Sequence, residues 1–262
     1  KLTSMRDEFM RNKMLSLLTL LICGSLLHGY QNSAPSLITP SNLYPGESEV
    51  NLAHRFYGKL KDEPLDTFFG MDNGANVQVS ARACVWKSLE LKAGYTRSGK
   101  QYDLGMSYRI SPVDFPILAQ LDWKYFSFVQ PGISSRRENF LYLAAFQAAP
   151  WKDRLVLTLN TGYDGYYERP VNGLGMQIFA TDKLSLIGEY YPVWDRDSAT
   201  NIVKQYLGKH DAYCIAIKAD TYGHHFIFSA GNSAGMDPRK QSLGADTRDL
   251  HLGFNIQRRL GS

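Results

Sequence analysis

The sequence has little of what would place it in several large classes of protein. Only 3 of its 262 residues are cysteines, and no CxxC, haem-attachment or zinc-type spacing occurs. The net charge is only +4 and the basic residues are scattered, so a nucleic-acid partner is not expected. The mean hydropathy is negative. This excludes a bundle of transmembrane helices but not a barrel, in which alternate strand residues are polar.

One long hydrophobic run lies near the N-terminus. The stretch MLSLLTLLICGSLL follows the basic residues Arg11 and Lys13 and precedes the polar HGYQNSAP. This order predicts a secretory signal peptide, because the run is short for a bilayer span; a buried core helix is the alternative. We expect residues 1–34 to form the signal peptide and leader and residues 35–262 to form the mature domain.

The three cysteines indicate no metal or redox site. Cys23 lies where a lipoprotein cysteine would, but Ile22 before it is bulkier than such a site usually accepts, so lipidation is not favoured. Cys84 and Cys214 both lie in the middle of expected strands, far apart in the sequence. We therefore expect them to be buried, unpaired thiols, although exported chains often form disulfides.

Apolar and polar residues alternate from residue 47 to the C-terminus. In NVQVSARACVW, residues 76–86, the apolar residues from Val77 to Val85 alternate with polar ones, which predicts a strand with one apolar face. NIVKQYLGK predicts a helical turn inside a loop. The same alternation predicts twelve strands, at residues 47–58, 74–86, 89–97, 101–111, 117–129, 139–149, 154–164, 172–181, 183–193, 211–220, 224–231 and 249–258.

The connections between these strands alternate in length. Long links such as KLKDEPLDTFFGMDN and NSAGMDPRKQSLGADTR alternate with short ones such as TDK and TYG. Outer-membrane barrels show this pattern, with long surface loops and short periplasmic turns, and with aromatic residues near strand ends. We predict an all-β fold: a transmembrane antiparallel up-and-down β-barrel of about twelve strands with both termini periplasmic. A soluble periplasmic sandwich is the alternative.

In such a barrel the valines and alanines of residues 77–85 face lipid and the opposite faces line the lumen. That interior is a narrow hydrated pore, or it is plugged by ion pairs and hydrogen bonds. The mixture of both signs names no charge class of solute. The candidate lumen-lining polar residues are Arg82, Glu90, Lys92, Asp103, Arg109, Asp122, Lys124, Glu189 and Lys218, joined by Asn160, Gln177, His251, Asn255 and Gln257.

No residue pattern supports catalysis, a cofactor or a metal. Ser229 shares a strand face with His225 but lies about 13 Å from it along the strand, too far for a nucleophile–base pair. The aspartates of the long loops match no EF-hand spacing. The sequence therefore predicts neither an enzyme nor a metal site.

Three short motifs resemble a family of predicted outer-membrane β-barrels from Bacteroidota. They are HRFYG (54–58), FFGMDNGANVQVS (68–80) and YDLGMSYRI (102–110), and LSLIGEYYPV (184–193) is similar to a later strand of that family. The resemblance covers most of the expected mature chain. It implies a barrel in the outer membrane and implies no activity, cofactor or site residue.

Three functions follow as hypotheses. The first is a narrow, porin-like channel or a membrane-embedded subunit of an envelope assembly. The second is a closed structural barrel whose loops, at residues 193–211 and 233–249, dock a partner protein. The third and least favoured is a lipid-modifying enzyme. The expected surroundings are outer-membrane lipids, with protein partners possible and nucleic acid excluded.

Overall fold

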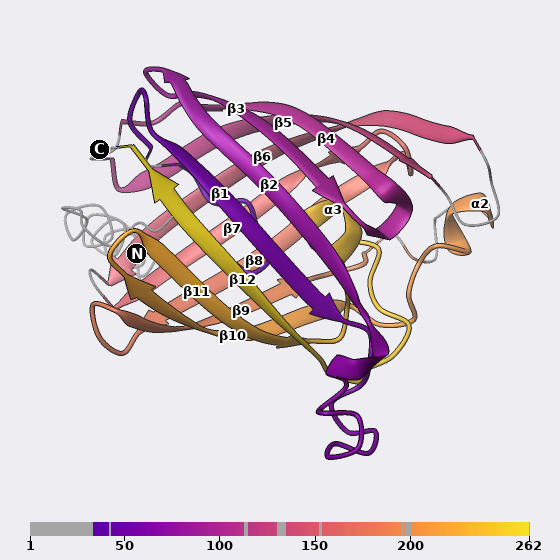
Figure 1. The fold of residues 1–262 in the computed structure, drawn as a ribbon. Coiled ribbons are helices and arrows are strands. Elements are labelled where there is room, and N and C mark those ends of the chain that lie inside the picture. The colour runs from indigo at the N-terminus through magenta and orange to yellow at the C-terminus, as the bar shows by residue number, and fades with distance from the viewer. Residues whose placement is uncertain are drawn as a thin grey trace, which may run out of the picture.

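The computed structural model describes residues 34–41, 43–112, 115–129, 135–151, 154–194, 196 and 201–261. In these ranges twelve strands form a closed antiparallel barrel, and β1 pairs with β12 to close it (Figure 1). This confirms the predicted fold class; the predicted signal peptide lies outside the described residues. The strands are β1 (Ser48–Phe56), β2 (Ala75–Trp86), β3 (Leu89–Thr96), β4 (Gln101–Arg109), β5 (Ile117–Val129), β6 (Arg136–Trp151), β7 (Leu155–Asp164), β8 (Arg169–Phe179), β9 (Leu184–Tyr191), β10 (Ala212–Thr221), β11 (His224–Gly231) and β12 (His251–Leu260).

Helix is confined to short pieces in the connections. The predicted helical turn is confirmed as α2 (Asn201–Lys204), whereas α3 (Pro238–Gln241) was not expected from the sequence. Two single 3-10 turns are η1 (Met71–Asn73) and η2 (Ser98–Lys100). Among the described residues, no helix has the length and apolarity needed to cross a bilayer.

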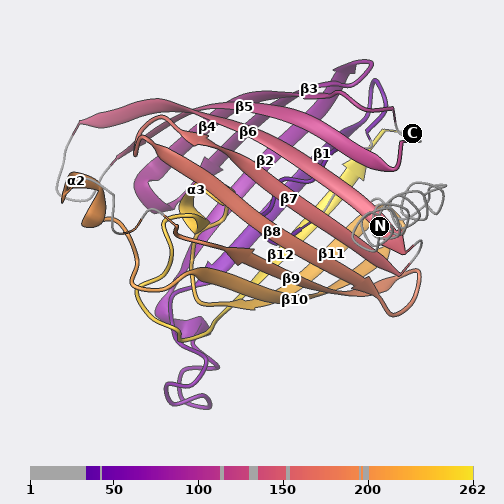
Figure 2. The same cartoon turned by 180° about the vertical axis from the view of Figure 1, so that it is seen from behind.

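The two ends of the barrel differ in their connections. β1 begins where β12 ends, since Ser48 pairs with Leu260. We call this end the turn end, because links as short as residues 87–88 and 222–223 lie there. The opposite, loop end carries the longest connections, at residues 57–74, 192–211 and 232–250. Figure 2 shows the barrel from behind, with β5 to β10 closing its other side.

The outer wall is apolar and the inner wall is mostly polar. In β4, Gln101 and Asp103 are only 3% and 7% exposed, whereas Tyr102 and Leu104 between and beyond them are 55% and 58% exposed. Val79 and Val85 of β2 likewise lie outside. A large apolar surface facing outward is the inverse of a water-soluble sandwich and suits contact with lipid. Not every aromatic residue follows the expectation that aromatic residues lie near strand ends, since Trp123 lies at the middle of β5.

One part of the inner wall departs from the polar pattern. Phe126 and Phe128 of β5, Leu141 and Leu143 of β6, and Val171 of β8 all point inward and are buried. We call these residues the inner apolar patch. An apolar surface inside a polar lumen is unfavourable in contact with water. The patch therefore has to be covered by other parts of the chain.

Candidate functional site

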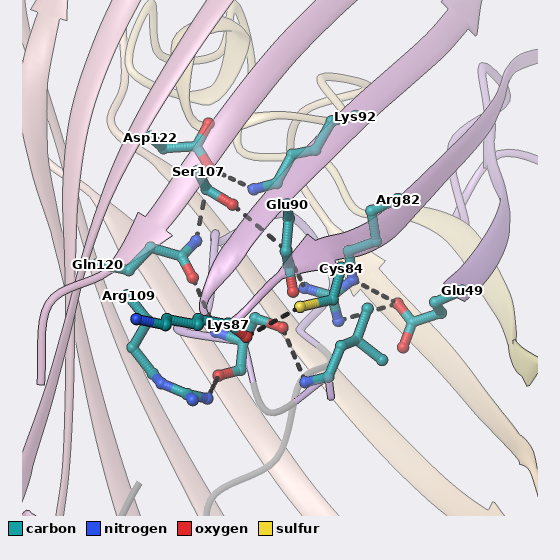
Figure 3. Close-up of polar contacts among 12 residues, drawn as sticks. Glu49, Arg82, Cys84, Lys87, Glu90, Lys92, Ser107, Arg109, Gln120 and Asp122 are labelled. Atoms are coloured by element: carbon teal, nitrogen blue, oxygen red, sulfur yellow. Dashed lines mark hydrogen bonds and ion pairs between the residues drawn. The ribbon is translucent and has the colours of Figure 1, made fainter. Parts of the chain in front are cut away.

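The charges of β1 to β5 are joined across strands into ion pairs (Figure 3). Arg82 Nη2 lies 3.1 Å from Glu49 Oε1, and Arg82 Nη1 lies 3.8 Å from Glu90 Oε2. The Lys92 ammonium forms an ion pair with the Asp122 carboxylate. Because each pair links different strands, the charges of this wall stabilise one another instead of presenting a single sign to a solute.

The remaining predicted charges also lie on the inner wall, in separate contacts. Lys124 Nζ is 3.6 Å from Asp237 Oδ2, and Lys218 Nζ is 3.3 Å from Asp220 Oδ1. Asp103 accepts a hydrogen bond of 2.7 Å from the Gln101 amide. Arg109 and Glu189, by contrast, bind a segment of the chain that lies inside the barrel, described next.

The lumen is filled from the turn end by residues 34–41, which we call the lumen segment. Its main chain is held by polar side chains of the wall. The Glu189 carboxylate accepts hydrogen bonds of 3.0 Å from the backbone N–H groups of Ser36 and Leu37. The Asn160 amide accepts from Ile38 N–H at 2.8 Å and donates to Ile38 C=O at 2.7 Å.

The two ends of the lumen segment are held in the same way. Arg55 Nη2 donates to Pro35 C=O at 2.7 Å, and Asn255 Nδ2 donates to the same oxygen at 3.1 Å. Ser41 N–H donates to Gln120 Oε1 at 2.9 Å, while Ser41 C=O accepts from Arg109. The wall thus satisfies backbone groups that would otherwise be buried without partners.

Two side chains of the lumen segment pack into the wall. The Leu37 side chain lies beside Gly173 and Gly175 and forms a buried cluster with Tyr191 and Ala212. Ile38 packs against the inner apolar patch. The segment therefore covers part of the apolar surface that the strands leave inside the barrel.

A second insertion enters from the loop end. Residues 232–250, which we call the inserted loop, carry α3 into the barrel outline (Figure 1). Arg239 of α3 is fully buried; its guanidinium carbon lies 3.9 Å from the Phe126 ring centre, and its Nη2 donates to Gln101 Oε1 at 2.6 Å. Gln241 Nε2 donates to Ser36 Oγ at 3.2 Å, so the inserted loop touches the lumen segment.

The two insertions leave a cavity on the charged side of the lumen, and apolar residues such as Leu37 and Met236 also line it. Its volume is about 170 Å³, which is room for several water molecules. Its lining includes Glu49, Arg82, Lys92, Asp122 and Lys124. The opposite side of the lumen, at the inner apolar patch, is covered. The interior is thus divided into a covered apolar side and a charged side that keeps a cavity.

A smaller polar cluster lies at the loop end of the wall. The Asp211 carboxylate accepts hydrogen bonds from the Tyr190 hydroxyl and, at 3.0 Å, from Val193 N–H, and it lies 3.3 Å from Arg196. Burial opposes ionisation, but the Tyr190 and Val193 hydrogen bonds and the Arg196 charge together hold the pKa of Asp211 below its ordinary value. The cluster fixes the start of the connection between β9 and β10.

The structure assembles no catalytic centre around the residues considered for one. His225 Nδ1 lies 2.6 Å from Asp220 Oδ1, whereas Ser229 pairs in the sheet with Ala216, four residues from Asp220 along β10. Cys84 and Cys214 are buried and unpaired, as expected. Within the described part of the chain, no three His, Cys, Asp or Glu side chains are grouped so as to hold a metal ion.

Several residues of the site were missed at the level of sequence. Arg55 lies inside HRFYG, an even number of residues after Glu49 in the same strand, so both side chains point inward. The alternation along this strand could therefore have identified Arg55. Arg239 and Ser36 belong to segments without any regular period. No local pattern indicates that such segments enter the barrel.

No family model and no curated protein matches this chain. Solved structures match at low identity. Outer membrane phospholipase A from Escherichia coli is 11% identical over 91% of this chain and 96% of that chain, with a TM-score of 0.46. Omp33 of Acinetobacter baumannii is 10% identical over 82% and 98%, with a TM-score of 0.44, and the NanC porin is 6% identical over 82% and 99%, with a TM-score of 0.43. The likeness is one of architecture, and no activity is carried over from it.

Proposed function

We propose that this protein is an outer-membrane barrel, exported through a cleaved signal peptide, that acts as a narrow channel and is closed at rest by its own two insertions. The observation that carries this proposal is the cavity that charged wall residues such as Arg82 and Lys124 line beside the lumen segment. The lumen segment and the inserted loop leave the charged side of the lumen unfilled, so a hydrated path for small polar solutes is already partly formed.

The way the lumen segment is held supports opening. Most of its contacts are hydrogen bonds between wall side chains and its main chain. Water can replace such bonds at a net cost of about 1 kcal/mol each, or about 1.5–3 kcal/mol where the wall group is charged. Withdrawal of residues 34–41 would leave the strand pairing of the barrel intact and would widen the charged path, since these residues line the cavity.

Conductance of the purified protein in planar bilayers tests the proposal. A shift of gel mobility on heating first shows that the barrel is folded. We expect rare, small openings for the wild type and more frequent openings for Glu189→Gln, which removes the charge that accepts the Ser36 and Leu37 hydrogen bonds. The matched control is Glu168→Gln, at an exposed position in the turn before β8. Charge reversal at Arg82 or Asp103 is expected to change the ion selectivity of the openings. Folded Glu189→Gln protein that stays as silent as the wild type would refute the channel.

A closed structural barrel that docks a partner is the second candidate. It is favoured by the inner apolar patch, since side chains such as Phe126 and Leu143 are covered only while the lumen stays filled. This candidate predicts a folded barrel without conductance in every variant. It also predicts a partner protein that is lost from purified membranes when the connection at residues 193–211 is shortened; the other loop expected to dock a partner, at residues 233–249, carries α3 into the barrel.

A further inference from the structure

We propose that the inner wall is a peptide-binding site, which takes the main chain of a peptide bent as residues 35–37 are, together with a leucine-sized side chain, and that residues 34–41 occupy it in cis. A peptide segment of a second protein is the ligand in trans. The proposal does not require conduction, because binding and ion flow are measured separately.

The contacts along the lumen segment are directed at its backbone. Wall side chains from β12 and β1 bind Pro35 C=O, one from β9 binds Ser36 and Leu37 N–H, one from β7 binds both polar groups of Ile38, and β5 and β4 together bind both polar groups of Ser41. Residues 35–37 are bent, which turns the adjacent N–H groups of Ser36 and Leu37 toward one carboxylate. A peptide that adopts the same bend presents the same backbone groups, so these contacts give affinity and select a backbone conformation more than a sequence.

The polar wall residues that make these contacts come from six strands. Glu189, Asn160 and Asn255 are only 3%, 0% and 2% exposed. Buried polar groups of this kind require partners, and the lumen segment supplies them. When the lumen segment leaves, the same groups are left to water or to another peptide.

The pocket that holds the Leu37 side chain gives the site its selectivity. A Cβ atom built at Gly175 would lie 2.4 Å from Leu37 Cδ1, and one built at Gly173 would lie 2.7 Å from Leu37 Cδ2. The absence of side chains at these two positions therefore makes the pocket, and Tyr191 and Ala212 complete it. The pocket therefore takes a leucine-sized aliphatic group.

The covalent link between Pro35 and β1 sets how the site is controlled. A tethered segment competes with a free peptide at a high effective concentration. The free peptide is therefore expected to bind the wild type weakly and to bind strongly only when the lumen segment is weakened. The Leu37→Ala protein provides that condition in the full chain.

The test is fluorescence anisotropy in detergent with a labelled peptide of residues 34–41, APSLITPS. We expect the folded Leu37→Ala protein to bind this peptide at least about tenfold more tightly than the wild type does, because its own segment has lost the buried anchor. Adding Gly175→Val, which fills the pocket, is expected to abolish the gain. Gly188→Val is the matched control, since a Cβ at Gly188 meets no atom within 4 Å.

Two altered peptides separate the two parts of the site. A peptide with alanine in place of the leucine tests the pocket, and a peptide N-methylated at the positions of Ser36 and Leu37 tests the Glu189 contact. Both are expected to bind at least about tenfold more weakly. The site would be overturned if Gly175→Val and both peptide changes left the affinity unchanged, or if the folded Leu37→Ala protein did not bind the peptide. Peptide binding by a barrel that never conducts would refute the channel and leave this inference standing.

Discussion

Replacing Arg239 with alanine is expected to release the inserted loop from the lumen. The buried guanidinium donates to Gln101 at 2.6 Å, stacks on Phe126 at 3.9 Å and lies 3.7 Å from the Asp164 carboxylate. Alanine removes all three contacts at once. It also leaves Asp164 without its counter-charge in a position that is only 1% exposed.

The size of the effect follows from these contacts. Loss of one member of a buried charged pair typically costs about 3–5 kcal/mol, and loss of a cation–π contact costs about 1 kcal/mol more. The released loop regains hydration, which offsets part of this. A net change of about 3 kcal/mol against insertion corresponds to about a hundredfold increase in the ratio of released to inserted loop.

Labelling of a cysteine placed in the loop measures that ratio. Ser242 is 2% exposed beside α3, so Ser242→Cys is protected from a membrane-impermeant maleimide while the loop is inserted. The native Cys84 and Cys214 are buried and give a slow background. When loop opening is fast compared with labelling, the labelling rate follows the released population. We expect Arg239→Ala to raise the rate about a hundredfold.

The control variant is Lys209→Ala, which removes a cation from an exposed position at the loop end. It is expected to leave the labelling rate unchanged. Heat-shifted gel mobility must show that every variant is a folded barrel at the labelling temperature. A rate for folded Arg239→Ala within about twofold of the parent, which is well below the hundredfold expected from the contact energies, would refute the role given to Arg239.

Three further predictions concern the wall. Gly162→Ala should destabilise the barrel by about 1–3 kcal/mol or more, because the new Cβ would lie 2.0 Å from a backbone oxygen of the facing strand. Gly188→Ala should have no effect, since its Cβ would meet no atom within 4 Å, and denaturant unfolding monitored by gel mobility compares the two variants. Lys92→Met should destabilise the barrel by about 3–5 kcal/mol by leaving Asp122 unpaired, and the double variant Lys92→Met/Asp122→Leu should regain most of that loss in the same assay; equal losses in both would contradict the pairing. The lowered pKa of Asp211 contributes stability above pH of about 4, and this stability is lost as the pH falls through the folded-state pKa. The wild type should therefore melt at a higher temperature than Asp211→Asn at pH 7, and the difference in melting temperature should disappear in acid. A difference that grows in acid would contradict the predicted direction of the effect.

The strands, and the side of the barrel to which each residue points, were predictable because apolar and polar residues alternate within each strand. In β2, Val79 and Val85 face outward while Gln78 and Cys84 face inward, and this difference is written at every second residue. The predicted ends agree with the observed ones to within a few residues. The largest differences are at the starts of β6 and β8, which begin at Arg136 and Arg169, before the predicted residues 139 and 172. The charged side chains at the start of β6 do not show the apolar alternation.

The contents of the lumen were only partly predictable. The candidate charges such as Arg82 and Lys124 lie on the inner wall, but their partners could not be paired from sequence, because ion pairs join different strands. The inward position of Phe126 and Leu143 ran against the expected polar interior. Between an open pore and a plugged lumen, the sequence left the choice open.

The sequence by itself therefore determined the barrel, because alternation along a strand is local and each strand meets the same two surroundings. Only the tertiary structure decided that residues 34–41 and α3 enter the lumen. The lumen segment has no period of its own, and the Asn255 amide that binds Pro35 lies 220 residues away along the chain. Closing the barrel brings β1, β9 and β12 together around one space, and it is this closure that turns scattered polar side chains into a site for a main chain.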